Sequence, residues 1–308
     1  MNKLRFLLSL ITKDNDYQLE QAASGQSAAQ QHGVELQILY ADNDAITQST
    51  QLLRAIQSDP SARPSAIIVE PTGGTAFPQV GQAAVKANIG WAVLNREADY
   101  ISSLRQSARV PVFSISSDHR EIGRIQGRQF AALLPAGGGV LYIQGPSETS
   151  AAKDRTTGMQ MSVPPEIHIT SLRARWTEES AQRAVEGWLS LSTSQKAQID
   201  MVAAQNDQMA LGARKAFEQV SDLVDRERWL NLPFTGVDGV PKTGQAWARI
   251  GLLAATVIVP TQSAQAVSML VEALQNGANP PERSFTVPES FPPLEKLSAQ
   301  KRKGAPTA

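Results

Sequence analysis

Short apolar runs alternate with longer amphipathic stretches along almost the whole chain. The run Ala66–Val69 is apolar at every position, as expected for a parallel strand buried on both faces. We predict ten strands: Leu4–Ile11, Val34–Tyr40, Ala66–Glu70, Trp91–Asn95, Val112–Ile115, Val140–Gln144, Ile167–Leu172, Met201–Gln205, Phe234–Asp238 and Leu253–Val259. The stretches between them predict nine helices: Tyr17–Gln31, Ala45–Ser58, Gln79–Ala87, Arg120–Leu133, Ala152–Gln160, Glu178–Ser190, Asp207–Val220, Gly239–Arg249 and Gln262–Asn276. This alternation predicts an α/β protein whose parallel sheets are covered by helices.

Ten strands are too many for one compact sheet in a chain of 308 residues, so we predict two five-stranded sheets. The fold would consist of two Rossmann-like lobes joined by a hinge of three crossing segments, with the first crossing near Ser114–Asp118. The predicted divisions are residues 1–116 with 260–285, residues 117–259 with 286–295, and a flexible tail at 296–308.

Two stretches have the charge content of surface loops, and we predict no regular structure in them. They are Glu97–Val110 and Ser221–Asn231.

The composition excludes several classes of protein. Lys and Arg number 29, and Asp and Glu also number 29, so the chain has no excess of positive charge that would attract nucleic acid. The absence of Cys excludes disulfides, thiolate nucleophiles and Cys-based zinc sites. No apolar run reaches the ~18 residues of a membrane span. The N-terminal run lacks a small-residue cleavage site, so we interpret it as a strand, with any export signal either removed or never present.

The sequence also lacks the usual motifs of catalysis and cofactor binding. No Gly-x-Gly-x-x-Gly, Walker or Gly-x-Ser-x-Gly motif occurs. The three histidines, His32, His119 and His168, are too far apart in sequence for a metal motif. We therefore predict no cofactor, no metal site and no enzymatic activity, and a chemistry of binding only.

Polar side chains follow most of the predicted strands, and the segment Ala203–Ala213 is the clearest case. It runs from an apolar strand into a helix, with Asn206 and Asp207 at the junction. These two residues either cap the helix or contact a ligand, because ligands of open α/β sheets bind at the carboxyl ends of strands. Similar polar endings recur on other strands, and amide, carboxylate and guanidinium groups with aromatic rings suit a sugar.

Several of these endings occur as motifs in a familiar order. The motifs are Glu70-Pro71-Thr72, Leu94-Asn95-Arg96, Thr149–Arg155, Gln205–Ala213, Val237-Asp238-Gly239 and Leu253–Thr256. The chain in this respect resembles a type I periplasmic binding protein of the ribose/galactose kind, over about Leu4 to Pro288.

In the first lobe, the resemblance implies ligand contacts from six residues. Asn15, Asp16 and Tyr17 stand where the family has a polar residue followed by aromatics. Glu70 stands where a polar group often contacts the sugar, and Asn95-Arg96 take the place of an Asp-Arg pair. The ordinary alternatives are a helix start that packs on the sheet for Tyr17 and a cap or surface position for Glu70.

In the second lobe, the resemblance implies four contacts. Arg155 would hold ring or hydroxyl oxygens, Trp176 would stack on the sugar, and Asn206 and Asp238 would bind hydroxyls. The alternatives are a surface ion pair for Arg155, a core or rim position for Trp176, and a turn with the following Gly for Asp238.

The chain departs from the family pattern in three places. The first loop lacks an aromatic run, which leaves Tyr17 alone there. Asn95 replaces an acid, and Ile258-Val259 lacks the polar side chain, commonly Gln, that is expected near Pro260.

The resemblance implies a monomeric receptor that closes around a small polyhydroxylated ligand and delivers it to an ABC permease or another membrane partner. It also implies a periplasmic location. The alternative is a ligand-sensing module of a signalling or transcription-regulatory system, perhaps in the cytoplasm. A repressor of this fold would need an N-terminal helix-turn-helix, whereas the first element that this sequence predicts is a strand.

Overall fold

The computed structural model describes residues 3–73, 77–96, 98–192, 194 and 197–299, which form two compact units. Lobe 1 comprises the residues up to Ser117 together with Pro260–Thr286. Lobe 2 comprises Asp118–Val259 and the residues from Val287 onward. The chain therefore passes between the lobes three times, after Ser117, Val259 and Thr286.

Lobe 1 is built on a six-stranded sheet in the order β11-β5-β4-β3-β1-β2. Every neighbouring pair is parallel. Its strands are β1 (Arg5–Leu10), β2 (Glu35–Tyr40), β3 (Ala66–Val69), β4 (Gly90–Leu94), β5 (Val112–Ser117) and β11 (Arg283–Thr286). Parallel pairing brings the carboxyl ends of β1, β3 and β4 to one edge of the sheet.

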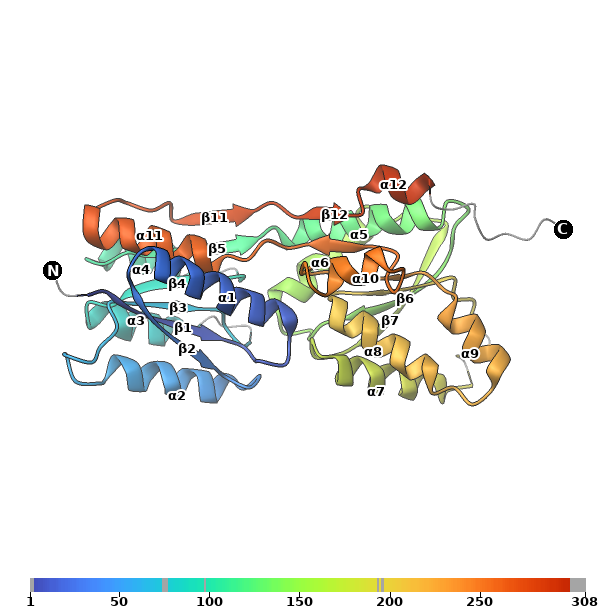
Figure 1. The fold of residues 1–308 in the computed structure, drawn as a ribbon, viewed down its shortest axis with the longest axis horizontal. Coiled ribbons are helices and arrows are strands. Elements are labelled where there is room, and N and C mark those ends of the chain that lie inside the picture. Colours follow the sequence, from blue (N-terminus) through green and yellow to red (C-terminus); the bar gives the residue numbers. More distant parts are fainter. Residues whose placement is uncertain (1–2, 74–76, 97, 193, 195–196, 300–308) are drawn as a thin grey trace. The chain divides into compact units, whose positions relative to one another are not determined.

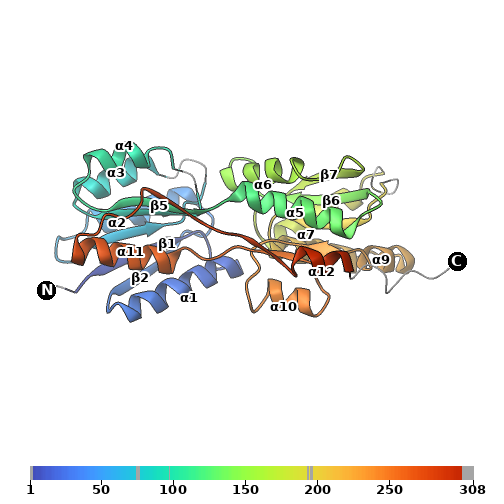
Figure 2. The same cartoon turned by 90° about the horizontal axis from the view of Figure 1, so that it is seen from above.

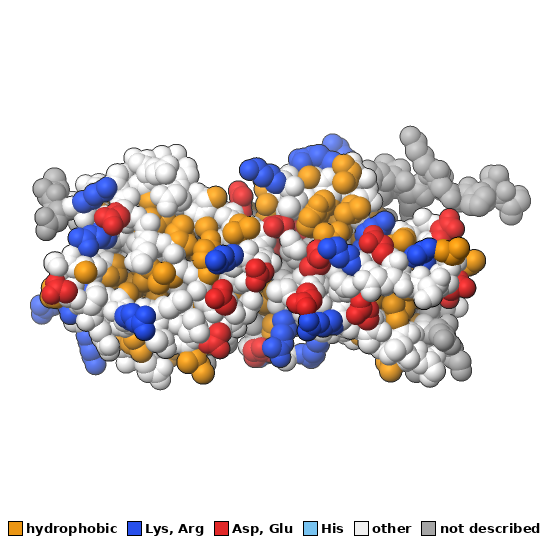
Figure 3. Space-filling view, turned by 60° about the horizontal axis from the view of Figure 1, so that its bottom comes forward, with side chains coloured by type: hydrophobic (Ala, Val, Ile, Leu, Met, Phe, Trp, Pro, Cys, Tyr) orange, Lys and Arg blue, Asp and Glu red, His pale blue; other side chains and the backbone are white. Residues whose placement is uncertain are grey.

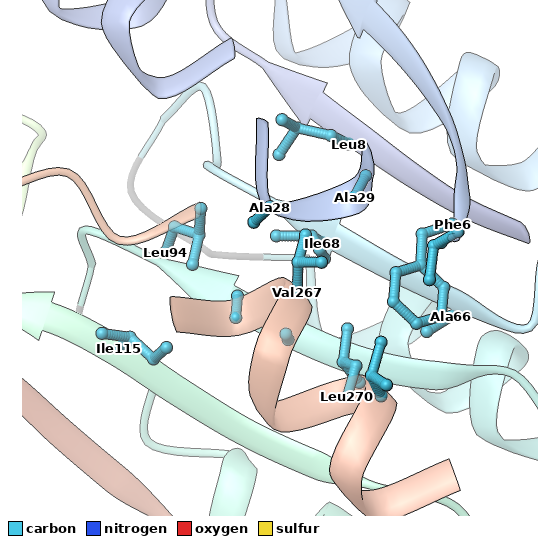
Figure 4. Packing of buried hydrophobic residues seen from close by; sticks show 14 of the residues in the cluster. Phe6, Leu8, Ala28, Ala29, Ala66, Ile68, Leu94, Ile115, Val267 and Leu270 are labelled. Atoms are coloured by element: carbon cyan, nitrogen blue, oxygen red, sulfur yellow. The ribbon is translucent and has the colours of Figure 1, made fainter. Parts of the chain in front are cut away.

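Helices cover both faces of this sheet because its central strands are apolar on both sides. The helices are α1 (Asp16–Gln31), α2 (Ala45–Ile56), α3 (Pro78–Lys86), α4 (Ile101–Ser107) and α11 (Ser263–Asn276). Phe6, Leu8 and Ile68 pack with Ala28 of α1 and Leu270 of α11, as Figure 4 shows. On the other face, the neighbouring strand residues pack against α2, α3 and α4. Helices α1 and α11 are far apart in sequence but lie side by side in both ribbon views (Figures 1 and 2).

Lobe 2 is built on a four-stranded parallel sheet in the order β7-β6-β8-β9. Its strands are β6 (Gly138–Gln144), β7 (Ile167–Arg173), β8 (Met201–Ala204) and β9 (Phe234–Thr235). A separate antiparallel pair consists of β10 (Thr256–Ile258) and β12 (Glu289–Phe291). The helices are α5 (His119–Leu133), α6 (Ser150–Gln160), α7 (Glu178–Leu189), α8 (Asp207–Glu218), α9 (Leu223–Leu230), α10 (Gly244–Arg249) and α12 (Leu294–Ala299).

The helices of lobe 2 also pack on both faces of their sheet. Phe217 of α8 packs on one face in a cluster that includes Trp188 and Trp229, and Phe130 of α5 packs against Tyr142 on the other. None of the helices that the structure describes is both long and apolar enough to cross a membrane.

The prediction of parallel α/β sheets in two lobes is confirmed, but the division into two five-stranded sheets is wrong. Strand β11 was not among the predicted strands, and it adds a sixth strand to lobe 1 by pairing with β5, with Phe285 opposite Ser116. The predicted strand Leu253–Val259 forms only the short β10, which pairs with β12 and joins the β9 edge of the lobe 2 sheet only through two isolated parallel bridges, Thr235 with Ala255 and Asp238 with Ile258.

Both predicted loops contain a helix. Helix α4 occupies part of the first, with Ile101 and Leu104 buried one turn apart, while Glu97 lies outside the described residues. Helix α9 occupies the second; Asp222 accepts from the backbone N–H of Asp225 as its N-cap, and Trp229 is buried. The charged residues that suggested loops are the solvent-facing sides of these two amphipathic helices.

The predicted helix at Gly239 starts five residues later, with α10. Asp238 and Gly239 have φ values of 108° and 57°, which no α-helix accommodates.

Part of the predicted flexible tail is helical. Helix α12 contacts α5, and its Leu297 is fully buried. Residues 300–308 lie outside the described residues.

Candidate functional site

Three candidates of lobe 1 stand where β1 leads into α1. Asn15 is the N-cap of α1, with its Oδ1 accepting from the backbone N–H groups of Tyr17 and Gln18. Asp16 is half-buried in the first turn, where a negative charge suits the positive end of the helix. Tyr17 is only 4% exposed, and its hydroxyl donates to Gln262 Oε1 at 3.1 Å and to the Pro260 carbonyl oxygen at 3.3 Å. The Tyr17 ring therefore lies inside lobe 1.

Glu70 directly follows β3 and is 1% exposed. Its Oε1 accepts from Asn95 Nδ2 at 2.9 Å, and its Oε2 accepts from Gln21 Nε2 at 3.3 Å. Arg96 Nη1 stands 3.9 Å from the same Oε1. Among the described residues, the carboxylate is therefore held by neighbouring side chains and has a buried positive charge beside it.

Asn95 and Arg96 follow β4 and are both about 5% exposed. Arg96 Nη1 donates to the Asn95 carbonyl oxygen at 2.7 Å. Asn95 has a φ of 55°, in the left-handed region that Asn tolerates better than most residues. The structure thus brings Glu70, Asn95 and Arg96 into one cluster at the carboxyl edge of the sheet.

Two residues of this lobe 1 cluster, Gln21 and Gln262, are absent from the candidates predicted from the sequence. Both are fully buried, and Gln21 Nε2 donates to Gln262 Oε1 at 2.6 Å. Gln262 lies two residues after Pro260, close to where the sequence lacks the expected polar side chain. A glutamine at a helix start has no local signal of burial, so sequence reasoning had nothing by which to find it.

In lobe 2, Arg155 is the centre of the candidate cluster. It lies on α6, is 4% exposed, and donates from Nη1 to the Gln205 carbonyl oxygen at the end of β8. Its Nη2 stands 3.9 Å from Asp238 Oδ1, and its Cζ lies 5.5 Å from the centre of the Trp176 ring. The Arg155 Nε–H is buried and has no hydrogen-bond partner among the described residues.

Trp176 and Asn206 are linked directly. Asn206 Nδ2 donates to the Trp176 carbonyl oxygen at 2.9 Å, and Asn206 Oδ1 accepts from the backbone N–H of Met209 as the N-cap of α8. Asn206 therefore both caps the helix and holds the loop that carries the indole. The indole also lies against Gly145, where an added Cβ would stand 2.2 Å from a ring carbon.

Asp238 is held by its backbone and by the residue that follows. It pairs as an isolated bridge with Ile258, and the Gly239 N–H donates to Asp207 Oδ2 at 2.8 Å. Asp207 Oδ1 accepts from Thr256 Oγ1 at 2.7 Å. Asp207, which the sequence places at the strand–helix junction, is thus the buried anchor of the loop that presents Asp238.

Gln205, directly after β8, connects this strand with β6 and, by donating to the Ala152 carbonyl oxygen, with α6. Its Oε1 accepts from the Gly145 N–H at 2.8 Å, and its Nε2 donates to the Tyr142 hydroxyl at 3.0 Å. Complete burial raises the pKa of Tyr142 well above its ordinary value, so this hydroxyl stays protonated and donates to Gln126.

Three candidates adopt positive φ values: Asn95, Trp176 at 65° and Asp238 at 108°. For a bulky residue such as Trp, this conformation costs about 1–3 kcal/mol, and such strain clusters at functional sites. The surrounding hydrogen bonds hold these residues in place against that cost.

In each lobe, one buried arginine stands beside one carboxylate, so the charges cancel within each pair. Around each pair stand amide groups, which both donate and accept hydrogen bonds. Such an arrangement suits a neutral ligand with hydroxyl groups better than an ion. Within the described ranges, no group of three His, Asp or Glu side chains could hold a metal ion. On the face shown in Figure 3, acidic and basic side chains are interspersed.

A family model described as a periplasmic binding protein domain matches residues 6–279. This chain belongs to that family. Its two parallel α/β lobes are the architecture of type I periplasmic binding proteins.

Curated members of the periplasmic binding protein family align with much of the chain. The ribose import binding protein RbsB of Salmonella typhimurium is 27% identical over 258 residues, which cover 83% of this chain and 79% of that protein. A putative rhizopine-binding protein of Rhizobium meliloti is 29% identical over 198 residues, or 63% of this chain. That alignment spans 60% of the rhizopine-binding protein, less than two thirds of its length.

Among solved structures, an ABC transporter periplasmic solute binding protein from Actinobacillus succinogenes with bound D-allose has the same fold. Its TM-score is 0.79 at 21% identity, and the match covers 96% of this chain and 100% of that one.

Proposed function

We propose that this chain is a solute-binding protein that takes up a small, neutral, polyhydroxylated ligand, a monosaccharide or a related polyol. The ten candidate residues would contact the ligand or hold the residues that do. Binding would favour a closed arrangement of the lobes through contacts that only that arrangement completes. In the periplasm, the closed form would then be recognised by an ABC permease of the membrane. The receptor would act as a monomer and leave the ligand chemically unchanged.

One observation carries this proposal more than any other, namely the cluster around Arg155. Its guanidinium lies beside the Trp176 ring and Asp238, and it keeps a buried Nε–H without a hydrogen-bond partner among the described residues. A buried donor left unpaired costs about 1–3 kcal/mol, a cost that a ligand hydroxyl or ring oxygen would remove. An indole face next to such a donor suits the C–H face of a sugar ring.

The names of the relatives support a carbohydrate or a polyol rather than an amino acid. One is a ribose import binding protein, another carries rhizopine in its name, and a third was solved with D-allose. The departures at Asn95 and in the first loop favour a ligand that differs from ribose in its hydroxyl pattern.

A thermal-shift screen of pentoses, hexoses, polyols, inositols and nucleosides tests the proposal, because a ligand that binds only the folded state raises the unfolding midpoint. Hits would be confirmed by calorimetry, where a micromolar dissociation constant, about −8 kcal/mol, is expected. If only amino acids or anions shifted the midpoint, the assignment to polyhydroxylated ligands would be wrong.

Lobe 2 offers a matched control for the role of Arg155. Arg214 also lies on a helix, places its Cζ 5.6 Å from an aromatic ring centre, and donates to a backbone carbonyl oxygen, that of Leu230. Its Nε, like that of Arg155, is buried without a hydrogen-bond partner among the described residues, but it stands 3.5 Å from a carboxylate oxygen of Glu218, which offsets its charge. Arg155→Met should lower affinity by about 10–100-fold, the effect of one charge-assisted hydrogen bond, whereas Arg214→Met should leave affinity unchanged.

Recovery of the ligand after incubation with the protein tests the absence of catalysis. A ligand recovered unmodified, with NAD or ATP present or absent, fits a binding protein, and turnover would contradict it.

A further inference from the structure

Gln262 is fully buried, and its side-chain amide uses all of its hydrogen-bonding capacity. Its Oε1 accepts from Gln21 Nε2 at 2.6 Å and from the Tyr17 hydroxyl at 3.1 Å. Its Nε2 donates to Ser117 Oγ at 2.9 Å and to the Pro260 carbonyl oxygen at 3.0 Å. An amide has two donor hydrogens and two acceptor lone pairs, so no capacity is left over.

On one side, Gln262 leads to the candidate ligand residues through Gln21. Gln21 Nε2 also donates to Glu70 Oε2, and Gln21 Oε1 accepts from the backbone N–H groups of Gln262 and Ser263. Gln21 of α1 thereby caps the start of α11. Glu70 in turn holds Asn95, with Arg96 beside it.

On the other side, Gln262 leads to every point at which the chain leaves lobe 1. Ser117 is the last residue before the first crossing, and Pro260 is the first residue after the second. Ser117 Oγ bonds Thr286 Oγ1 at 2.9 Å, and Thr286 is the last residue before the third crossing. Each of the three crossings therefore has its lobe 1 residue, Ser117, Pro260 or Thr286, in one hydrogen-bonded network with Gln262 at its centre.

We propose that Gln262 is a positioning residue. It couples ligand binding at the cluster of Glu70, Asn95 and Arg96 to the three segments that cross between the lobes. Gln21, Gln262 and Ser117 are at most 2% exposed, so water has little access to replace a broken bond. A shift of Glu70 or of a crossing segment must therefore be matched along the network or leave a buried polar group unpaired. The coupling rests on the proposed function, since it supposes a ligand at this cluster.

The test combines ligand affinity with a direct measurement of lobe movement. The sequence contains no Cys, so Ser61→Cys in lobe 1 and Ser221→Cys in lobe 2, both exposed, accept a fluorescent pair cleanly. Energy transfer reports ligand-induced movement, and calorimetry reports affinity. The variant Gln262→Glu keeps the acceptor toward Gln21 but removes the donors toward Ser117 and Pro260.

We expect Gln262→Glu to weaken binding by about tenfold and to reduce the ligand-induced change in energy transfer at saturation, in line with the usual size of coupling effects. In the Glu70→Gln background, the same substitution should have a clearly smaller effect on affinity, because the two residues act through one network. Gln48→Glu is the matched control. Gln48 is a buried glutamine of lobe 1 whose Nε2 donates to Ser9 Oγ and the Glu70 carbonyl oxygen and whose Oε1 accepts from the Thr72 N–H, and none of these partners lies at a crossing.

If Gln262→Glu and Gln48→Glu alter affinity and energy transfer equally, Gln262 has only a structural role and the inference is overturned. If the Gln262 variant does not fold, Ser117→Ala serves instead, because it removes only the link between Gln262 and Thr286. Ser117→Ala should reduce the ligand-induced change in energy transfer while leaving the affinity within about threefold of wild type. A ligand-induced change as large as that of wild type would contradict the inference. A wild-type protein that binds no sugar or polyol would instead refute the proposed function.

Discussion

The candidate clusters of the two lobes hold their polar groups by different means. In lobe 1, the buried Glu70 is held by side chains from two separate places, Gln21 of α1 and Asn95 directly after β4. In lobe 2, the buried Asp207 is held by a backbone N–H and by one hydroxyl, those of Gly239 and Thr256. Both lobes place an arginine 3.9 Å from a carboxylate, but in lobe 2 that carboxylate belongs to Asp238, whose loop Asp207 anchors through the Gly239 backbone N–H.

The surroundings of the glycines show the same difference. Gly236 and Gly244 lie directly against Asp207, where an added Cβ would stand about 2 Å from a carboxylate oxygen. At Gly25 of α1 in lobe 1, the nearest atoms to an added Cβ are side-chain atoms at 3.0 Å or more. Lobe 2 therefore depends on close backbone approach, whereas lobe 1 depends on a network of side chains.

The largest effect is expected from Asp207→Ala. The substitution leaves the Gly239 N–H and the Thr256 hydroxyl without their buried acceptor, which should lower the free energy of unfolding by about 3–4 kcal/mol. Chemical denaturation measures this loss. The control is Asp200→Ala, because Asp200 is exposed and accepts one backbone N–H, that of Gly139, at 2.8 Å. Equal losses for the two variants would show that Asp207 is not a special anchor.

A pair of glycine substitutions contrasts the two lobes directly. In Gly123→Ala, the new methyl group would stand 2.0 Å from the Arg155 carbonyl oxygen, so α5 and α6 must move apart. We expect a loss of about 2–3 kcal/mol, together with weaker ligand binding, because α6 carries Arg155. Gly25→Ala meets only the Leu8 and Ser263 side chains and should cost less than about 1 kcal/mol. Thermal unfolding and calorimetry measure both effects, and a reversed order would contradict the contrast.

Glu70→Gln tests the side-chain network of lobe 1. The new amide removes the negative charge beside Arg96 and turns one acceptor into a donor, so we expect a loss of about 2 kcal/mol and weaker binding. Adding Asn95→Asp restores a carboxylate next to position 70, where the two side chains now stand 2.9 Å apart. The double variant should recover much of the stability. No recovery would mean that the charge matters less than the shape of the cluster.

The contrast between the lobes also explains what the sequence could predict. Apolar runs mark the buried strands most clearly, as in β3 and β4, where every residue is buried. Strand β11 was missed because its residues Arg283 and Phe285 are exposed, so the segment has no buried apolar run. The helices α4 and α9 were missed because their charged outer faces outweighed a few buried residues.

For the candidate site, the difference is one of sequence distance. Asn206 and Asp207 are neighbours at a strand end, and their polarity at a predicted junction is visible locally. Gln21 and Gln262 meet across 241 positions, and neither lies in a motif that predicts burial. Long-range networks of uncharged side chains such as this one become visible only in the folded chain.

The smallest effect is expected outside both candidate clusters, at Glu121 on α5 of lobe 2. Partial burial alone would raise the pKa of Glu121, but hydrogen bonds and charge from Arg128 and Arg124 outweigh it and hold the pKa below its ordinary value of 4.5. A carboxyl with a lowered pKa stabilises the fold fully above its unfolded value and loses that contribution as the pH falls through the folded value. Glu121→Gln should therefore cost less than about 1 kcal/mol at pH 7, since solvent screens these ion pairs, and the difference from wild type should shrink below pH 4.5. Urea denaturation at pH 7 and in the acidic range measures the difference. A gap that grew on acidification would reverse the sign and show that Glu121 is stabilised in its protonated form.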